Sequence, residues 1–236
     1  MRAVRLSFFY MLKIVMQDKM LFAALMSPIF AGIAIYFGVP VAEKLLIQET
    51  GLRAVLTPYY SLFDIFFASL TPVMFCFIAS MVVLEENDDH IDFYLFITGL
   101  GKKGYFVSRM VLPALLAFLI TVILLPVVKL TALSGVEIIL LSLAGSLQGI
   151  VIALLIVAIS SNKLEGMAVT KLASLMIFGA VAPFFVPSPI DLCVFFLPSF
   201  WMGKAAAEGK PVVMLLSFFA AVIWIFILKR KYDRKL

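Results

Sequence analysis

Six long apolar runs, separated by short polar stretches, dominate the pattern of residues along the chain. Each run is close to the 20 or so residues that a helix needs to cross a hydrocarbon core of roughly 30 Å. A β-barrel needs short segments of alternating hydrophobicity instead, so the pattern predicts helices. The expected spans are residues 21–41, 62–84, 108–128, 138–160, 172–189 and 212–228. We therefore expect an all-α membrane protein with one transmembrane domain over residues 1–236.

Residues 1–20 precede the first run and have a different pattern. At helical spacing, one polar face spans an arc of roughly 120° and an apolar face lies opposite. The polar face holds Arg2, Arg5, Lys13 and Gln17, and the apolar face holds Val4, Phe8, Met11 and Val15. This pattern predicts an amphipathic helix in the membrane interface, with a bend at Asp18 and Lys19. No small-residue cleavage site follows, so we expect this segment to be retained.

Composition and charge agree with a membrane protein and indicate its orientation. The chain is 64% hydrophobic and only 14% charged, and its mean hydropathy is +1.14; a water-soluble globule needs more surface charge. With both termini in the cytoplasm, the inner segments hold fourteen lysines and arginines and the outer segments hold five. This asymmetry predicts a multi-pass protein of the plasma membrane. The net charge of +5 then reflects topology and contact with anionic lipid, and no nucleic-acid partner is needed.

The sequence offers little catalytic chemistry. His90 is the single histidine, no H-E-x-x-H or G-x-S-x-G pattern occurs, and the Gly-Lys of a phosphate loop is followed by Lys103 rather than Ser or Thr. We expect this chain to have no catalytic residue, no metal site and no cofactor, and therefore not to be an enzyme. Asp64, near the outer end of the second run, is a candidate for an ion-transport path. The alternative, which we favour, is a helix-end residue that reaches interfacial water.

The most polar stretch lies between the second and third runs, at residues 84–109. Read as one helix, four acids share a face at i, i+3, i+4 and i+7, and aromatic residues lie beside them. The acids are Glu85, Asp88, Asp89 and Asp92, and the other residues of interest are His90, Phe93, Tyr94 and Phe96. Such aromatic residues suit docking into a partner's groove. A helix that lies on the membrane surface with its acids in water explains the pattern equally well.

Two segments resemble those of a known family. The stretch "FITGLGKKGYFVSR", which leads into the third run, resembles the loop between spans two and three of type-2 ABC exporter permeases, with Thr98, Tyr105 and Arg109 at matching positions. The stretch "SSNKLEGMAVTK" resembles the family's segment between spans four and five. The resemblance also includes the six spans and the entry helix, so it covers nearly the whole chain.

The resemblance implies that residues 85–107 form a cytosolic coupling helix, which docks into a separate ABC ATPase subunit. ATP and Mg would be bound by that partner. Two permease copies, identical or different, would form the working unit with two ATPase subunits. The implied docking residues are Glu85, Asp88, Asp89, His90, Asp92, Phe93, Tyr94 and Phe96, and Lys163, Glu165 and Gly166 would form a smaller second contact.

The outer segment, residues 184–211, is too apolar for a solvated loop and contains prolines that interrupt a continuous helix. It resembles the re-entrant hairpin that forms a lid before the last span of these exporters. Its outer gate candidates are Phe195, Phe196, Phe200 and Trp201. An aromatic belt at the membrane interface is the alternative explanation.

The expected function is export of a hydrophobic or amphipathic cargo (a drug, a peptide or a lipid) driven by the ATPase partner. The 23 phenylalanines and 12 methionines favour an apolar, adaptable cavity for such a cargo. Two alternatives are an ion-coupled carrier or channel, which would depend on Asp64, and a membrane scaffold without transport activity.

Overall fold

The computed structural model describes residues 2–187 and 189–235, and within these ranges it contains helices and turns but no strand. The expected all-α architecture is confirmed. Residues 1, 188 and 236, which fall in the predicted entry helix, the outer segment and the end of the chain, lie outside the described residues. Six helical stretches are long and apolar enough to cross a membrane: Lys19–Thr50, Thr57–Asp88, Gly101–Val128, Gly135–Ile159, Lys163–Phe185 and Pro211–Lys235.

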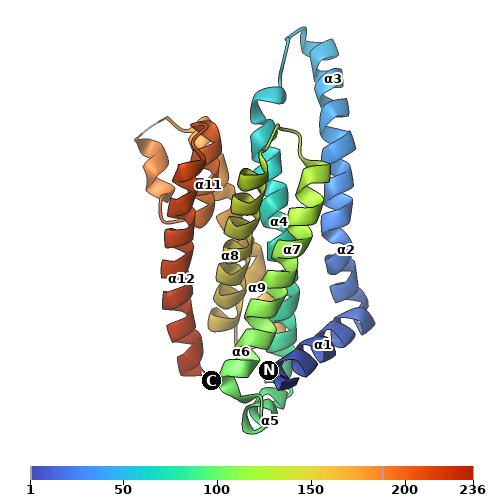
Figure 1. Ribbon diagram of the computed structural model, residues 1–236, viewed down its shortest axis with the longest axis vertical. Coiled ribbons are helices and arrows are strands. Elements are labelled where there is room, and N and C mark those ends of the chain that lie inside the picture. Colours follow the sequence, from blue (N-terminus) through green and yellow to red (C-terminus); the bar gives the residue numbers. More distant parts are fainter. Residues whose placement is uncertain (1, 188, 236) are drawn as a thin grey trace.

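Helices α4 (Tyr60–Asp88) and α8 (Gly135–Ile159) form the centre of the bundle, and most of their side chains are buried. They pack backbone against backbone, because a Cβ added at Gly145 of α8 would lie 2.2 Å from the Ala68 carbonyl oxygen of α4. Small residues allow such close approach where the hydrophobic effect cannot drive two helices together in lipid. Helices α2 (Lys19–Ile33), α7 (Leu112–Val128), α9 (Lys163–Ser174) and α12 (Met214–Lys235) surround this pair (Figure 1).

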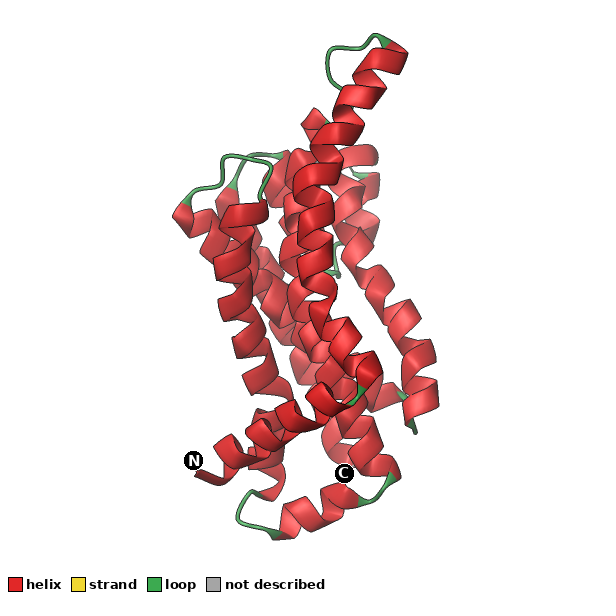
Figure 2. Cartoon of the chain, turned by 90° about the vertical axis from the view of Figure 1, so that its right-hand side faces the viewer, coloured by secondary structure: helices red, strands yellow, loops and turns green. Residues whose placement is uncertain are grey.

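Both ends of the described chain lie at the same end of the bundle, which we call the terminal end (Figures 1 and 2). Helix α1 (Arg2–Gln17) runs across this end at an angle to the spans. Its Met11 and Val15 are buried, whereas Arg5 and Lys13 are exposed; its amphipathic position in the membrane interface stays a prediction. Between α1 and α2, the Asp18 carboxylate caps α2 by accepting hydrogen bonds from the backbone N–H groups of Met20 and Leu21.

After α2, the first span continues through a π-helical turn, η1 (Ala34–Gly38), into helix α3 (Val39–Thr50), which extends beyond the predicted residue 41. Its outer turns project beyond the rest of the bundle (Figure 2). The helix ends at Gly51, whose φ of 68° stops helical hydrogen bonding. Buried Glu43 then holds the following loop by accepting hydrogen bonds from three backbone N–H groups, at Val55, Leu56 and Thr57. The apolar run alone could not show this polar extension.

The fifth span begins at Lys163 rather than at the predicted residue 172, because Asn162 caps the N-terminus of α9 through a hydrogen bond from the Glu165 N–H. It continues as the 3₁₀ segment η4 (Leu175–Val181) and helix α10 (Ala182–Phe185). Short helices η5 (Ile190–Val194) and α11 (Pro198–Ala207), followed by η6 (Pro211–Val213), then lead into α12. These breaks agree with the expectation that prolines interrupt the outer segment.

One prediction about the stretch between the second and third spans is wrong. It is not a single helix with one acidic face, because α4 ends at Asp88 and His90 adopts a left-handed conformation with φ of 56°. The chain then forms α5 (Ile91–Ile97), α6 (Gly101–Phe106) and the π-helical turn η3 (Val107–Val111) before α7. Helix α5 consequently lies across the terminal end of the bundle (Figure 1).

Candidate functional site

Helix α5 presents an exposed apolar surface outside the six spans. Its Ile91, Phe93, Tyr94 and Ile97 are 41%, 57%, 70% and 83% exposed. Four large apolar side chains on a seven-residue helix are unfavourable in water and are typical of a surface that binds a partner. Phe93 and Tyr94, predicted from the sequence as docking residues, belong to this set. We call these four side chains the α5 surface.

Phe96 does not belong to the α5 surface, although it was predicted with it. Its ring is half-buried and packs edge-on against Tyr105, with the ring centroids 5.2 Å apart. Asp92 is also buried, and its carboxylate accepts a hydrogen bond from the Phe93 N–H. Burial raises the pKa of this carboxyl group. Of the predicted acids, Asp89 is exposed next to His90, which is exposed too.

Glu85 and Asp88 contact the neighbouring helix α9 instead of pointing freely away from the protein. The Lys163 ammonium group lies 2.8 Å from a Glu85 carboxylate oxygen and 3.8 Å from one of Asp18. The Lys163 backbone N–H donates to the Asp88 carboxylate at 2.9 Å. The structure therefore brings the two predicted inner contacts together, as a junction between the ends of α4 and α9.

The other residues of the predicted second contact support this junction. Glu165 closes the turn before α9 by accepting a hydrogen bond from the Ser161 N–H at 2.6 Å. Gly166 is buried, and a Cβ at this position would lie 2.3 Å from the Leu84 side chain. These two residues shape the start of α9, and the glycine permits its close approach to α4.

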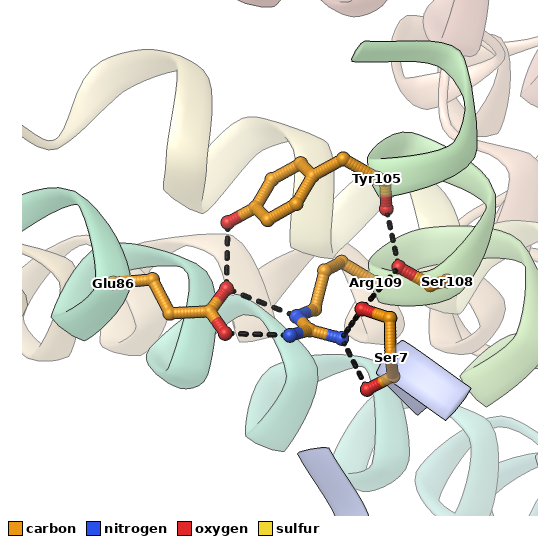
Figure 3. Close-up of polar contacts among 5 residues, drawn as sticks. All are labelled: Ser7, Glu86, Tyr105, Ser108 and Arg109. Carbon is orange, nitrogen blue, oxygen red and sulfur yellow. Dashed lines mark hydrogen bonds and ion pairs between the residues drawn. The ribbon is translucent and has the colours of Figure 1, made fainter. Parts of the chain in front are cut away.

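Next to α5, whose Phe96 packs against Tyr105, a buried polar cluster joins three elements (Figure 3). The Arg109 guanidinium group forms a two-pronged ion pair with Glu86, with N···O distances of 2.5 and 3.0 Å. The Tyr105 hydroxyl donates to the same carboxylate at 2.8 Å. A third guanidinium nitrogen donates to the backbone oxygen of Ser7 at 2.9 Å and to its hydroxyl at 3.1 Å.

This cluster links α4 through Glu86, the start of the third span through Tyr105 and Arg109, and α1 through Ser7. Because charge-assisted, bidentate hydrogen bonds have a fixed geometry, the three elements are held in one arrangement. The sequence marked Tyr105 and Arg109 only as family-like positions, and Glu86 is an acid of the polar stretch at residues 84–109 to which no role of its own was assigned. A charged residue beside an apolar span was the available signal, but the partner could not be chosen from the sequence.

For Asp64, the predicted contact with interfacial water is wrong, and a place on an ion-transport path stays a prediction. It is only 2% exposed, so it does not reach interfacial water. Its carboxylate accepts hydrogen bonds from the backbone N–H groups of Leu130 and Thr131 at 2.8 and 3.0 Å, and from the Thr131 hydroxyl. It therefore fastens the loop between α7 and α8 to the start of α4, in the way that Glu43 holds the loop after α3.

Three of the predicted gate residues lie together at the end of the bundle opposite the terminal end. Phe195, Phe196 and Trp201 line an apolar groove of about 400 Å³ against one face of α12. Both tryptophans of the chain fasten this segment: Trp201 donates to the Phe195 carbonyl at 2.7 Å and Trp224 to the Phe196 carbonyl at 2.8 Å.

The fourth predicted gate residue, Phe200, is fully buried and does not line this groove, although its ring packs edge-on against Trp201 with the centroids 5.1 Å apart. Its ring lies 5.4 Å from the Lys204 ammonium group, which also pairs with buried Asp191 at 3.4 Å. Phe200 thus anchors α11, and the groove is formed without it.

A family model described as "Fluoroquinolones export permease protein Rv2686c-like" matches residues 11–229. The chain belongs to this export permease family. Two relatives, named fluoroquinolones export permease proteins Rv2686c and MT2760, come from Mycobacterium tuberculosis strains H37Rv and CDC 1551. Each is 26% identical to this chain over 198 residues, which is 80% of this chain and 75% of the relative. No solved structure matches the chain.

Membership of the Rv2686c-like family, together with six apolar helices, makes the protein a multi-pass membrane permease of an export system. The family match includes Glu86, Tyr105 and Arg109 of the polar cluster. It does not include Ser7, because the match begins at residue 11. It also contains the α5 surface and the groove beside α12. Apart from Ser7, these three features therefore lie within the residues that the family model matches.

Proposed function

We propose that this permease is driven by a separate ABC ATPase subunit, which docks on the α5 surface and which binds the ATP and Mg. The observation that carries the proposal is the exposure of four large apolar side chains on a short helix at the terminal end, outside the spans. The resemblance of this loop to the coupling loop of type-2 ABC exporter permeases supports the same assignment.

The buried carboxylates within the described spans favour an external source of energy. Glu43, Asp64 and Glu86 are each occupied by hydrogen bonds or an ion pair that hold two segments together. A proton- or cation-coupled carrier needs a carboxylate that can exchange its partner during transport. The positions of these three groups therefore argue against the ion-coupled alternative, and family membership argues against a scaffold without transport.

Helix α5 is connected directly to the second and third spans, so its movement would be passed on to them. Helix α5 lies between the end of α4 and the start of the third span, and the Glu86–Arg109 pair joins these two beneath it. The contacts of Lys163 add α9 to the same group. In the proposed mechanism, closure of the ATPase displaces α5, and the joined ends of these helices move as a unit to alternate access to the cargo path.

The cargo that we propose is an amphipathic aromatic drug of the fluoroquinolone class, with an amphipathic peptide or a lipid as the alternatives. The names of the two mycobacterial relatives support the drug class. The apolar groove lined by Phe195, Phe196 and Trp201 provides aromatic surface against which a planar ring can stack. Residues 184–211 then form the outer lid in a re-entrant arrangement.

The proposed working unit contains two permease copies and two ATPase subunits in the plasma membrane, with the terminal end in the cytoplasm. This orientation places α5 on the side where ATP is available. It also places the larger number of lysines and arginines on the cytoplasmic side, as membrane insertion favours.

The test is co-purification with an ATP-binding cassette protein, sought first among the products of the neighbouring genes, after substitution of the α5 surface. We expect Phe93→Ser/Tyr94→Ser to weaken the complex about 10-fold or more, because each large apolar side chain contributes roughly 1.5–3 kcal/mol on burial. Drug-stimulated ATP hydrolysis should fall in parallel. The matched control is Leu52→Ser, which removes an exposed apolar side chain at the opposite end of the bundle.

Asp89→Lys separately tests whether an acid beside the α5 surface contributes to docking. Asp89 is suitable because it is exposed, whereas Asp92 is buried. A complex that forms normally with the Phe93→Ser/Tyr94→Ser variant would show that the ATPase docks elsewhere. Normal drug export by a cell that lacks the ATPase would contradict the energy source itself.

A further inference from the structure

A second groove lies at the terminal end, between the start of the third span and the end of α12. Its volume is about 330 Å³. Lys102 and Lys103 of α6 line it from one side, and Lys229 of α12 lines it from the other. Asp233 is the only acid among its lining residues, so three positive charges face one negative charge. The groove therefore attracts anions.

The walls of the groove are aromatic and hold the lysines at the rim. The Lys229 ammonium group lies 4.7 Å from the centre of the Phe106 ring, and the Phe106 and Tyr232 rings are 6.1 Å apart. Long lysine side chains commonly run along apolar surface and keep the charged group at the membrane boundary. The groove thus has an apolar interior with a cationic rim, which matches an amphiphile better than a small hydrophilic anion.

Apolar side chains continue from the groove along both spans. Val107 lines the groove, and Val111 and Leu115 follow it at steps of four residues, all exposed. On α12, Phe226 and Val222 precede Lys229 by three and seven residues, and both are exposed as well. A molecule whose charged group sits at the lysines therefore meets a hydrocarbon surface where its acyl chains would lie.

We propose that this groove is a specific site for an anionic phospholipid, in which the lysines hold the phosphate of the headgroup and the acyl chains lie along the apolar side chains of the two spans. Basic grooves between membrane helices bind such headgroups. Because the groove joins the ends of the third and sixth spans, a bound lipid would bridge these spans beside the Glu86–Arg109 pair. The site does not depend on an ATPase partner.

Native mass spectrometry of the whole permease, purified in detergent and mixed with phosphatidylglycerol or phosphatidylcholine, tests the site. We expect retention of phosphatidylglycerol and little retention of phosphatidylcholine. Lys103→Gln/Lys229→Gln should reduce phosphatidylglycerol affinity by about 5- to 25-fold, the range for losing one or two lysine contacts at about 1 kcal/mol each. Lys44→Gln/Arg53→Gln, which removes the same charge from exposed positions at the opposite end, is the control.

Asp233→Asn provides a test in the other direction, because it removes the single negative charge of the groove and should tighten phosphatidylglycerol binding. This variant remains informative if the double lysine variant is poorly folded. Equal retention of phosphatidylglycerol by the wild type and both groove variants would overturn the site. Equal binding of the two lipids would overturn its headgroup selectivity, and displacement of the lipid by millimolar inorganic phosphate would assign the groove to a soluble anion instead.

Discussion

At the scale of single residues, Arg109 is a buried charge that depends on a compensating partner. It is permanently charged, its side chain is 1% exposed, and its charge is compensated by Glu86 within the protein. A buried pair of this kind contributes little net stability compared with apolar residues of the same size, but removal of one partner leaves an uncompensated charge. The cost of a substitution therefore depends on whether the other partner is still charged.

Arg109→Met should destabilise the permease by about 3–5 kcal/mol, because Glu86 is then left buried and unpaired. Glu86→Leu/Arg109→Met should recover a large part of this loss, since neither charge remains. Unfolding in SDS titrations measures both free energies. Tyr105→Phe, which removes one hydrogen bond from the same carboxylate, is the control and should cost about 1–2 kcal/mol. If the double variant were less stable than Arg109→Met, the pair would hold the fold by attraction rather than by mutual compensation.

At the scale of helices, the contact between α4 and α8 depends on the absence of side chains at particular positions. Gly145 and Gly149 lie against the backbone of α4, and a Cβ at the second position would lie 2.9 Å from the Pro72 carbonyl oxygen. Backbone atoms in the middle of a helix cannot move aside as a side chain can. The distance between the two central helices is therefore determined by these glycines.

Gly145→Ala should consequently destabilise the protein by about 1–3 kcal/mol, the usual cost of overpacking, although alanine is a better helix former than glycine. Gly135→Ala is the matched control on the same helix, because a Cβ there meets no atom within 4 Å. The control should be neutral or slightly more stable in the same SDS titration. A Gly145→Ala protein as stable as the control would mean that α4 and α8 can separate at little cost.

Helix α5 shows how element boundaries affect function. The hydrophobic pattern correctly indicated an aromatic, acidic segment between the second and third spans. However, the left-handed turn at His90 separates Glu85 and Asp88 from Asp92, so the acids do not form one face. The surface available to a partner is instead mainly apolar, and the acidic contribution reduces to Asp89 and its immediate neighbours.

At the scale of the whole molecule, both chain ends and α5 lie at one end of the bundle, and the loop after α3 lies at the other (Figures 1 and 2). A correct count of spans does not orient the bundle, whereas the distribution of lysine and arginine predicts an orientation, with the terminal end in the cytoplasm. Orientation matters for the mechanism, because the proposed ATPase can act only from the cytoplasm.

Single-cysteine labelling tests this orientation. In a Cys193→Ser background, where Cys76 is buried, Leu52→Cys should react with a membrane-impermeant maleimide applied to intact cells. Tyr94→Cys should react only after the membrane is opened, because we expect α5 on the cytoplasmic side. Both positions are exposed in the structure, so a difference reports sidedness. Labelling of Tyr94→Cys in intact cells would reverse the topology and exclude the proposed ATPase contact.

The sequence by itself determined the number and order of the spans and the presence of a helix before the first span, and its resemblance indicated an export permease. Apolar length and helical periodicity are local properties, so neighbouring residues are enough to reveal them. Only the tertiary structure decided which charges meet. Glu86 pairs with Arg109 across 23 residues, Glu85 with Lys163 across 78, and Asp64 holds a loop 66 residues away. These partners are chosen by how the helices pack, because burial of a charge in a membrane protein is tolerated only where packing brings a compensating group within hydrogen-bonding distance.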